Sequence, residues 1–249
     1  MPSSYNIMRE QVMTRIAALF MGLVSVLCVS CAQPDGPAPD ARSSSADLAP
    51  VERAGGLHPR IVFLGDSLTA GLGLAKEESV PSLIHARLRA AGYPYEVVNA
   101  GVSGDTSAGG LSRLDWSLEG DVKVLVIELG ANDGLRGLPV AGLKRNLAEV
   151  ITRATSRGIK VVLTGMEAPP NFGEAYTTEF RQVYRDLAKS HDVAFLPFYL
   201  DGVAGIPSLN IGDGMHPNAE GSRMIERALW RTLEPLLDKP AGAGRSSTK

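Results

Sequence analysis

Residues 122–129, with the sequence VKVLVIEL, form a nearly continuous run of apolar and β-branched side chains. A strand with one face in water alternates apolar and polar residues, whereas a continuous run is typical of a strand buried on both faces. Such strands occur mainly in parallel sheets that helices cover on both sides. This segment therefore predicts an α/β fold.

Short apolar runs alternate with helical patterns on both sides of this segment. Further strands are expected at 61–64, 96–99, 160–164 and 193–197. Helices are expected at 80–91, 139–156, 174–190 and 219–237. This alternation predicts a parallel sheet with helices on both faces. In such sheets, sites form where the strands reach their carboxyl ends.

The first 31 residues predict an export signal rather than part of a folded domain. Arg9 and Arg15 precede an uncharged apolar segment at 16–29, and small residues follow it. A basic front edge, a short apolar run and small residues after it are typical of a secretory signal. The run is shorter than the about 20 apolar residues that a transmembrane helix needs.

Both cysteines of the chain, Cys28 and Cys31, lie in this signal. The sequence LCVSC resembles a bacterial lipoprotein signal, with Cys31 as the lipidated first residue of the mature protein. The alternative is cleavage near Ala32, which would give a soluble secreted protein. In either form the mature domain has no disulfide, so core packing alone must stabilise it. We expect an exported protein, either periplasmic or held at a bacterial membrane by this lipid anchor.

The remaining chain divides into one domain and two flanking segments. Residues 32–57 are rich in Pro, Ala, Ser and Asp, and they predict a disordered linker, as residues 239–249 predict a disordered tail. Residues 58–238 are enough for one domain, which we expect to be monomeric. The 25 basic and 27 acidic residues are interspersed and give a net charge of −2. Without a basic stripe, no nucleic-acid partner is expected.

Residues suited to catalysis follow three of the expected strands. Ser67, in RIVFLGDSLTAGLG, follows the first strand, where free backbone N–H groups at a helix start can point at a substrate oxygen. Gly104, in NAGVSGDTSAGG, has no side chain to keep its N–H from a reacting centre. Asn132, in ELGANDGLRG, can donate to a developing negative charge, while Asp133 is expected to cap a helix or turn. Taken singly, Ser67 also fits a helix cap, Gly104 a flexible surface loop and Asn132 an ordinary turn.

The segment IGDGMHPNAEG places Asp213 three residues before His216. A carboxylate at this spacing can accept the Nδ1–H of the ring, fix the tautomer and leave Nε2 to take a serine proton. The other histidines, His58, His85 and His191, have no such partner. A metal site would need further ligands that the sequence does not cluster here, so we expect neither a metal nor another cofactor.

The order Gly-Asp-Ser, Gly, Gly-x-Asn-Asp and Asp-x-x-His in four successive loops resembles that of the SGNH, or GDSL-type, hydrolases, over essentially the whole expected domain. SGDTSAGGLSRL and the phrases around it are similar to the bacterial periplasmic branch with thioesterase I, lysophospholipase and arylesterase activities. The resemblance implies a flavodoxin-like three-layer α/β/α sandwich with a central, mostly parallel five-stranded sheet. It implies Ser67 as nucleophile, His216 as base and Asp213 as its orienter. It also implies an oxyanion hole made by the Ser67 and Gly104 N–H groups and the Asn132 side chain.

Four further residues are expected to contact substrate: Asp66, Ala131, Pro170 and Phe172. Ala131 stands where that branch generally has glycine, and its methyl group is expected to trim the pocket without abolishing catalysis. The segment MEAPPNFGEAY, with Pro170 and Phe172, is apolar and partly rigid, which favours acyl chains over sugars. Its alternative interpretation is a plain connecting loop.

We therefore expect a serine esterase that cleaves carboxylic ester or thioester bonds of small acyl substrates through an acyl-enzyme. A carbohydrate O-acetyl esterase is the alternative, because triad residues do not distinguish the two. Trp116 and Trp230 lie in helical patterns and are expected in the core rather than as sugar platforms. A non-catalytic tethered binding module is a further alternative. A nucleotide-binding domain is disfavoured, because neither G-x-x-x-x-G-K-[ST] nor G-x-G-x-x-G follows a strand.

Overall fold

The computed structural model of the chain describes residues 58–238. The expected export signal with the lipidated Cys31, the linker at 32–57 and the tail at 239–249 lie outside these residues. Within 58–238, no helix combines the length and hydropathy that a bilayer span requires.

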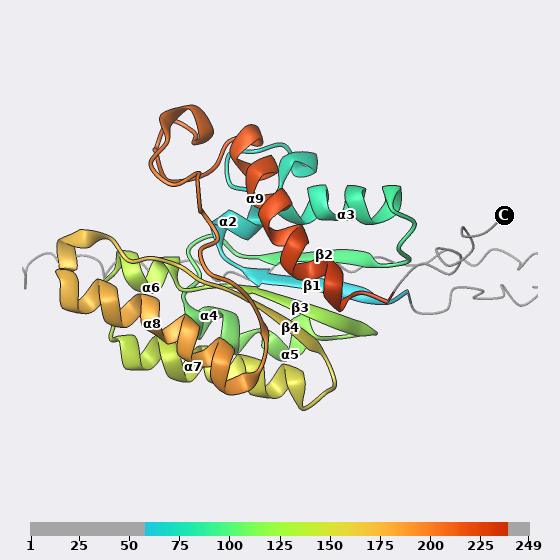
Figure 1. Ribbon diagram of the computed structural model, residues 1–249, viewed down its shortest axis with the longest axis horizontal. Coiled ribbons are helices and arrows are strands. Elements are labelled where there is room, and N and C mark those ends of the chain that lie inside the picture. Colours follow the sequence, from blue (N-terminus) through green and yellow to red (C-terminus); the bar gives the residue numbers. More distant parts are fainter. Residues whose placement is uncertain (1–57, 239–249) are drawn as a thin grey trace, which may run out of the picture. The chain divides into compact units, whose positions relative to one another are not determined.

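Five strands form one sheet in which every neighbouring pair is parallel. The strands are β1 (Arg60–Gly65), β2 (Glu96–Gly101), β3 (Val122–Glu128), β4 (Lys160–Thr164) and β5 (Ala194–Leu196). Their order across the sheet is β2-β1-β3-β4-β5 (Figure 1). This is the flavodoxin-like order, and it confirms the predicted five-stranded α/β fold.

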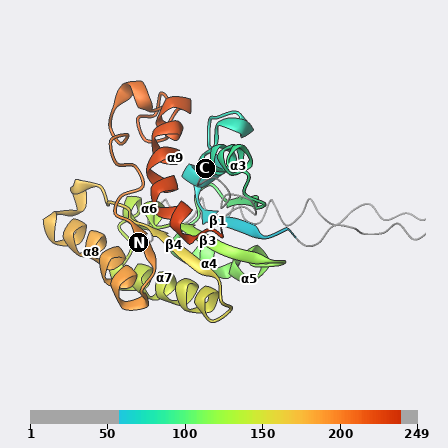
Figure 2. The same ribbon diagram turned by 45° about the vertical axis from the view of Figure 1, so that its right-hand side comes forward.

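Helices cover both faces of the sheet (Figures 1 and 2). One face carries α3 (Val80–Ala90) and α9 (Ala219–Leu233), which pack on each other. The opposite face carries α4 (Ser107–Ser112), α7 (Val140–Thr155) and α8 (Glu174–His191). Shorter helical turns connect these elements: α2 (Ser67–Ala70), η1 (Lys76–Glu78), α5 (Leu114–Ser117), α6 (Ala131–Leu135), η2 (Pro170–Phe172), η3 (Pro207–Leu209) and η4 (Glu234–Leu236).

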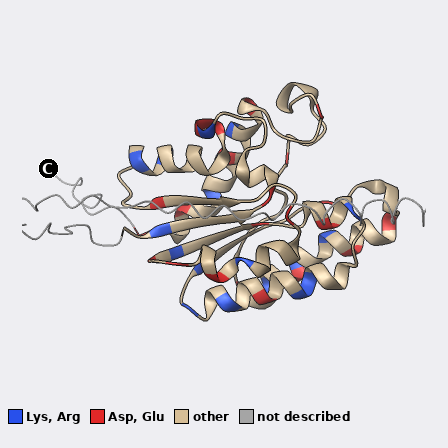
Figure 3. Cartoon of the chain, turned by 180° about the vertical axis from the view of Figure 1, so that it is seen from behind, with Lys and Arg blue, Asp and Glu red and all other residues tan. Residues whose placement is uncertain are grey.

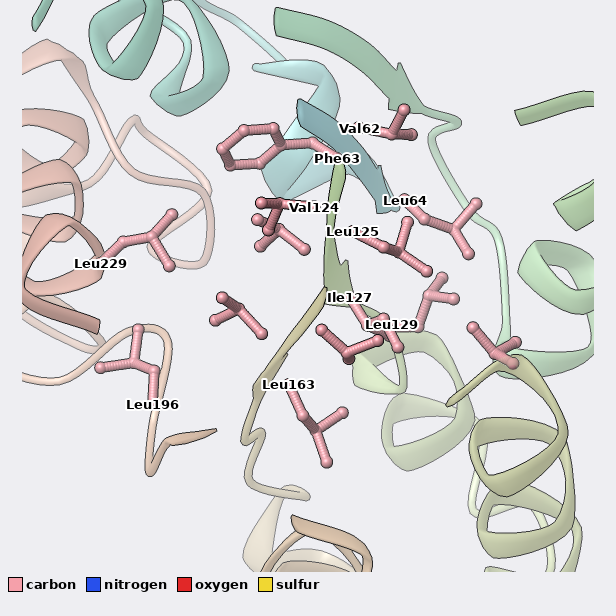
Figure 4. Packing of buried hydrophobic residues seen from close by; sticks show 14 of the residues in the cluster. Val62, Phe63, Leu64, Val124, Leu125, Ile127, Leu129, Leu163, Leu196 and Leu229 are labelled. Carbon is pink, nitrogen blue, oxygen red and sulfur yellow. The ribbon is translucent and has the colours of Figure 1, made fainter. Parts of the chain in front are cut away.

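The apolar run at 122–129 is buried on both of its faces, as its sequence predicts. Val124 and Leu125 point to opposite sides of the sheet, and both are fully buried. Figure 4 shows them packing with Phe63 and Leu64 of β1, the strand that pairs with β3. Full burial of such a side chain contributes about 1.5–3 kcal/mol. Charged residues lie along the helices and near the strand ends, leaving the middle of the sheet uncharged (Figure 3).

The last helix is shorter than its sequence pattern predicts. It ends at Leu233 and continues as the 3₁₀ turn η4, rather than as α-helix to residue 237. Pro235 lies in this turn and has no N–H to donate to a preceding helical carbonyl, which ends the regular helix.

The two tryptophans differ in burial. Trp230 is buried in α9, as expected. The prediction for Trp116 is wrong, because its side chain is 69% exposed. It lies in the four-residue helix α5, whose buried residues are Leu114 and Ser117, so Trp116 occupies the outer side of that turn.

Candidate active site

Ser67 stands at the carboxyl end of β1 as the first residue of α2. The cap of this helix is Asp66, whose Oδ1 accepts a hydrogen bond of 3.0 Å from the Leu68 N–H. Ser67 is therefore not the capping residue, and its hydroxyl is available. Gly65 permits the turn, because a methyl group there would overlap the Thr69 hydroxyl.

A chain of hydrogen bonds joins Ser67 to two residues near the end of the domain. Oγ of Ser67 lies 2.8 Å from Nε2 of His216, and Nδ1 of His216 lies 2.6 Å from Oδ2 of Asp213. The loop that carries Asp213 and His216 is closed by a 2.8 Å hydrogen bond from the Ile211 N–H to the His216 carbonyl. The structure thus brings together the serine, histidine and aspartate that the sequence singled out.

Asp213 is held as a carboxylate by local hydrogen bonds. Its Oδ1 accepts from the backbone N–H groups of His216 (3.0 Å) and Met215 (2.9 Å), and its Oδ2 faces the His216 ring. These bonds, led by the one from the His216 backbone, lower the pKa of Asp213 to about 2. The side chain therefore stays negative throughout the weakly acidic and neutral range.

Gly104 lies in the loop after β2, beside the serine. Its φ of +86° belongs to the left-handed region, which glycine adopts without strain. Arg136 donates a 2.9 Å hydrogen bond to the Gly104 carbonyl. Arg113, which the sequence analysis did not single out, donates to Asp105 (2.6 Å) and to the Ala100 carbonyl at the end of β2 (2.6 Å). Two arginines thus fix the loop.

Asn132 lies in the second position of α6, directly after β3. Its Nδ2 donates a 3.1 Å hydrogen bond to Oδ2 of Asp66. Its neighbour Asp133 is buried and accepts from the backbone N–H (2.7 Å) and hydroxyl (2.6 Å) of Ser107. Asp133 therefore binds the first residue of α4 from within α6, and it is not itself the cap that the sequence predicted, since the cap of α4 is Thr106.

Ser67, Gly104, Asn132 and His216 all line one cavity of about 720 Å³. Most of its other lining residues are apolar and come from the loops after β1, β3, β4 and β5, among them Leu72, Leu135, Met166, Pro169, Phe198 and Leu200. The cavity therefore combines one polar end, at the serine, with largely apolar walls.

The four expected substrate contacts take different positions. Ala131 lines the cavity. Asp66 does not line it but is fully buried behind Asn132. Neither Pro170 nor Phe172 lines it, and the Phe172 ring packs instead on Tyr176, with ring centroids 5.4 Å apart.

Met166 belongs to the segment MEAPPNFGEAY that the sequence analysis expected near the acyl chain, whereas Phe198 and Leu200 were missed as cavity residues. Each lies within a few residues of the carboxyl end of β4 or β5, which is the one signal that pointed to them. Among residues 58–238, no group of three or more His, Cys, Asp or Glu side chains is arranged to hold a metal ion.

The domain matches known proteins over nearly all of its described length. The model of the GDSL-like lipase/acylhydrolase family matches residues 63–224. Esterase TesA of Pseudomonas aeruginosa is 44% identical over 178 residues, which cover 71% of this chain and 89% of that protein. An arylesterase of Vibrio mimicus is 40% identical over 175 residues, covering 70% of this chain and 88% of that protein.

Solved structures agree with this match. The crystal structure of TesA has a TM-score of 0.68 at 44% identity and covers 72% of this chain and 99% of its own. The crystal structure of AlinE4, an SGNH-hydrolase family esterase, has a TM-score of 0.60 at 39% identity and covers 74% and 98% respectively.

Proposed function

The chain belongs to the GDSL-like lipase/acylhydrolase family and is an ester hydrolase, and we propose that it acts through a triad of Ser67, His216 and Asp213. The observation that carries this proposal is the unbroken chain from the Ser67 hydroxyl through both nitrogens of His216 to Asp213. The same arrangement of groups activates serine in unrelated hydrolases, where geometry and not sequence order defines the role.

In the first half-reaction, Oγ of Ser67 attacks the acyl carbonyl carbon and its proton passes to Nε2 of His216. The tetrahedral intermediate collapses, the bond to the leaving oxygen or sulfur breaks, and His216 returns the proton to that atom. Water then attacks the acyl-enzyme in the same way and releases the carboxylic acid and free serine. Ionised Asp213 stabilises the imidazolium that forms in each step.

The oxyanion of each intermediate needs donors in the same cavity. We assign this role to the backbone N–H groups of Ser67 and Gly104 and to the side-chain amide of Asn132. Support comes from their common position around the serine. Donors that are fixed before the reaction stabilise developing charge without reorganising.

Apolar walls favour acyl chains as the occupants of the cavity. Residues such as Met166, Phe198 and Leu200 offer contact area to methylene groups but no hydrogen bonds to sugar hydroxyls. The curated relatives are named esterase, arylesterase and thioesterase 1/lysophospholipase L1. We therefore favour acyl esters or thioesters over O-acetylated carbohydrates.

The test compares p-nitrophenyl esters of increasing acyl length, an acyl-CoA thioester and an acetylated oligosaccharide, with the Ser67→Ala variant as control. Serine-dependent kcat/KM that is held or rises with chain length supports the proposal. Turnover confined to acetyl groups would establish the carbohydrate esterase instead. If no substrate showed serine-dependent turnover, the remaining hypothesis would be the non-catalytic tethered binding module.

We propose export for the full chain on the evidence of its first 31 residues, with Cys31 as the lipidated residue. Replacing Cys31 by serine should abolish incorporation of a labelled fatty acid into the protein, because the thioether-linked anchor cannot form. Incorporation that is unchanged in this variant would contradict lipidation at Cys31. Light scattering of the purified protein tests the expectation of a monomer.

Replacing Asn132 by alanine is expected to lower kcat by about 10²-fold, which corresponds to about 3 kcal/mol of lost transition-state stabilisation. KM should change little, because the ground-state carbonyl uses this donor less than the oxyanion does. Steady-state kinetics on one ester at fixed pH measure both constants. An unchanged kcat would mean that Asn132 only shapes the turn.

On its acidic side, the pH profile of kcat/KM should show the titration of a single group. The pKa of Asp213 is lowered to about 2, so its carboxylate and any stability that it contributes persist until the pH falls toward that value. Any loss of kcat/KM on the acidic side of the profile above that pH then comes from a group other than Asp213. A plot of log kcat/KM against pH should rise with a slope of one and level off. A slope of two would show that Asp213 titrates in the same range.

A further inference from the structure

Behind the proposed oxyanion hole lies a buried glutamate that the mechanism above does not use. Glu128 is the last residue of β3 and is fully buried. Its Oε2 accepts hydrogen bonds from the Thr69 hydroxyl (2.8 Å) and from the Asp66 backbone N–H (3.3 Å). Its Oε1 is also buried and has no hydrogen-bond partner among the described residues. A buried carboxyl oxygen without a partner calls for a physical explanation.

A second buried carboxyl group, that of Asp66, lies next to Glu128 and contacts Asn132 directly. Asp66 uses Oδ1 to cap α2 through Leu68 and Oδ2 to accept from Nδ2 of Asn132. An amide NH₂ has two hydrogens. Asp66 therefore occupies one of them and leaves the other on a group that lines the cavity.

Two adjacent buried carboxyl groups cannot both be ionised at low cost. Burial, and then the negative charge of Asp66, raise the pKa of Glu128 well above its usual range. Burial also raises the pKa of Asp66, but hydrogen bonds from the Leu68 backbone and the Asn132 amide oppose that rise. The other titratable side chains that act on the pair include His216, which lowers the pKa of Asp66, and Tyr184 and Tyr199, whose own pKa burial raises. Glu128 is thus the acid of the pair, and a neutral carboxyl group accounts for a buried Oε1 that accepts no hydrogen bond.

We propose that Glu128 and Asp66 form a carboxylic acid–carboxylate pair that positions Asn132 for catalysis. Glu128 holds the Asp66 backbone N–H and the Thr69 hydroxyl through Oε2, and Asp66 holds one hydrogen of the Asn132 amide so that the other points at the oxyanion. The inference deepens the proposed function and rests on Asn132 being an oxyanion donor. Asp66 and Glu128 are positioning residues, since neither lines the cavity.

Asp66→Asn is the direct test. The asparagine side chain keeps one acceptor oxygen, but its NH₂ group must then face a donor, which is either the Leu68 N–H or the Asn132 amide. We expect kcat to fall by about 10- to 100-fold, the cost of a misplaced catalytic group, with KM nearly unchanged.

The decisive measurement is a double-mutant cycle with Asn132→Ala. If Asp66 acts through Asn132, Asp66→Asn should lower kcat by less than about threefold in the Asn132→Ala background. An equal fold-loss in both backgrounds would overturn the inference while leaving the oxyanion assignment intact. If Asn132→Ala alone kept full kcat, both the assignment and the inference would fall. Should Asp66→Asn not fold, Glu128→Ala takes its place in the cycle.

Glu128 itself is tested by a conservative pair of variants. Glu128→Gln keeps an oxygen for Thr69 and places an NH₂ group where Oε1 was, so kcat should stay within about threefold of wild type, a change below that of a lost interaction. Glu128→Ala removes the acceptor of the Asp66 N–H and the Thr69 hydroxyl and should resemble Asp66→Asn. Thr164→Val is the matched control, since it removes another buried hydroxyl, which donates 3.0 Å to the Ile127 carbonyl and not to the side chain of Glu128, Asp66 or Asn132. Equal losses of kcat in Glu128→Gln and Glu128→Ala, or full activity of Glu128→Ala, would contradict a positioning role for Glu128.

Discussion

Replacing Ser67 by alanine is expected to lower kcat for every ester by about 10⁴-fold or more, because the acyl-enzyme can no longer form. The loss should be accompanied by little change in Tm. Ser67 does not cap α2, since Asp66 does, and its hydroxyl interacts with His216 rather than with the core. Single-turnover kinetics with a p-nitrophenyl ester, together with thermal unfolding of the same preparation, measure both quantities.

The control for this experiment is Ser103→Ala, which removes a hydroxyl from another cavity-lining serine that the mechanism gives no covalent role. That variant should retain an acyl-enzyme burst, whereas Ser67→Ala should show none. Turnover by folded Ser67→Ala at the wild-type rate would refute the serine mechanism. A large drop in Tm would instead reveal a structural role for the hydroxyl.

Replacing His216 by glutamine is expected to lower kcat by a similar factor, about 10⁴-fold or more, because among residues 58–238 the Ser67 hydroxyl is hydrogen-bonded to no other side chain that could take its proton. The two residues work as a unit, so the Ser67→Ala/His216→Gln double variant should be hardly slower than either single variant. Their effects would multiply only if each contributed independently.

The measurement is kcat at a pH on the plateau of the wild-type profile, for the two single variants and the double variant. His85→Gln is the matched control, since that histidine lies in α3 and is not among the residues that line the cavity. His216 would be excluded as the base if the His216→Gln variant kept the wild-type kcat and the same decrease of kcat/KM at acidic pH.

Much of the fold follows from local sequence signals. The apolar run in β3 predicts burial on both faces, and the alternation of elements predicts the parallel sheet that the strand pairing confirms. The order of the strands does not follow from these signals, because pairing depends on contacts between segments far apart in the chain. The end of a helix can also differ from its predicted position because of a single residue, as Pro235 ends α9 before residue 237.

The candidate site also contains residues that can be predicted from the sequence and residues that cannot. Ser67, Asn132 and the Asp213–His216 pair are recognisable because their chemistry and spacing appear within short segments. The role of Asp66 is not, since its contact with Asn132 joins residues 66 positions apart. The cavity walls, such as Met166 and Phe198, are ordinary apolar residues whose position becomes clear only when the strand ends are brought together.

The proposed catalytic pair spans almost the whole domain, since Ser67 and His216 are 149 positions apart. Ser67 follows the first strand, and His216 precedes the final helix. Closing so long a loop is slow relative to local helix formation, and its entropy must be offset by the docking of α9. A chain still being synthesised therefore holds its serine without its base. Recovery of esterase activity during refolding should consequently lag behind the return of helical circular dichroism and mark the moment at which the two ends of the domain meet.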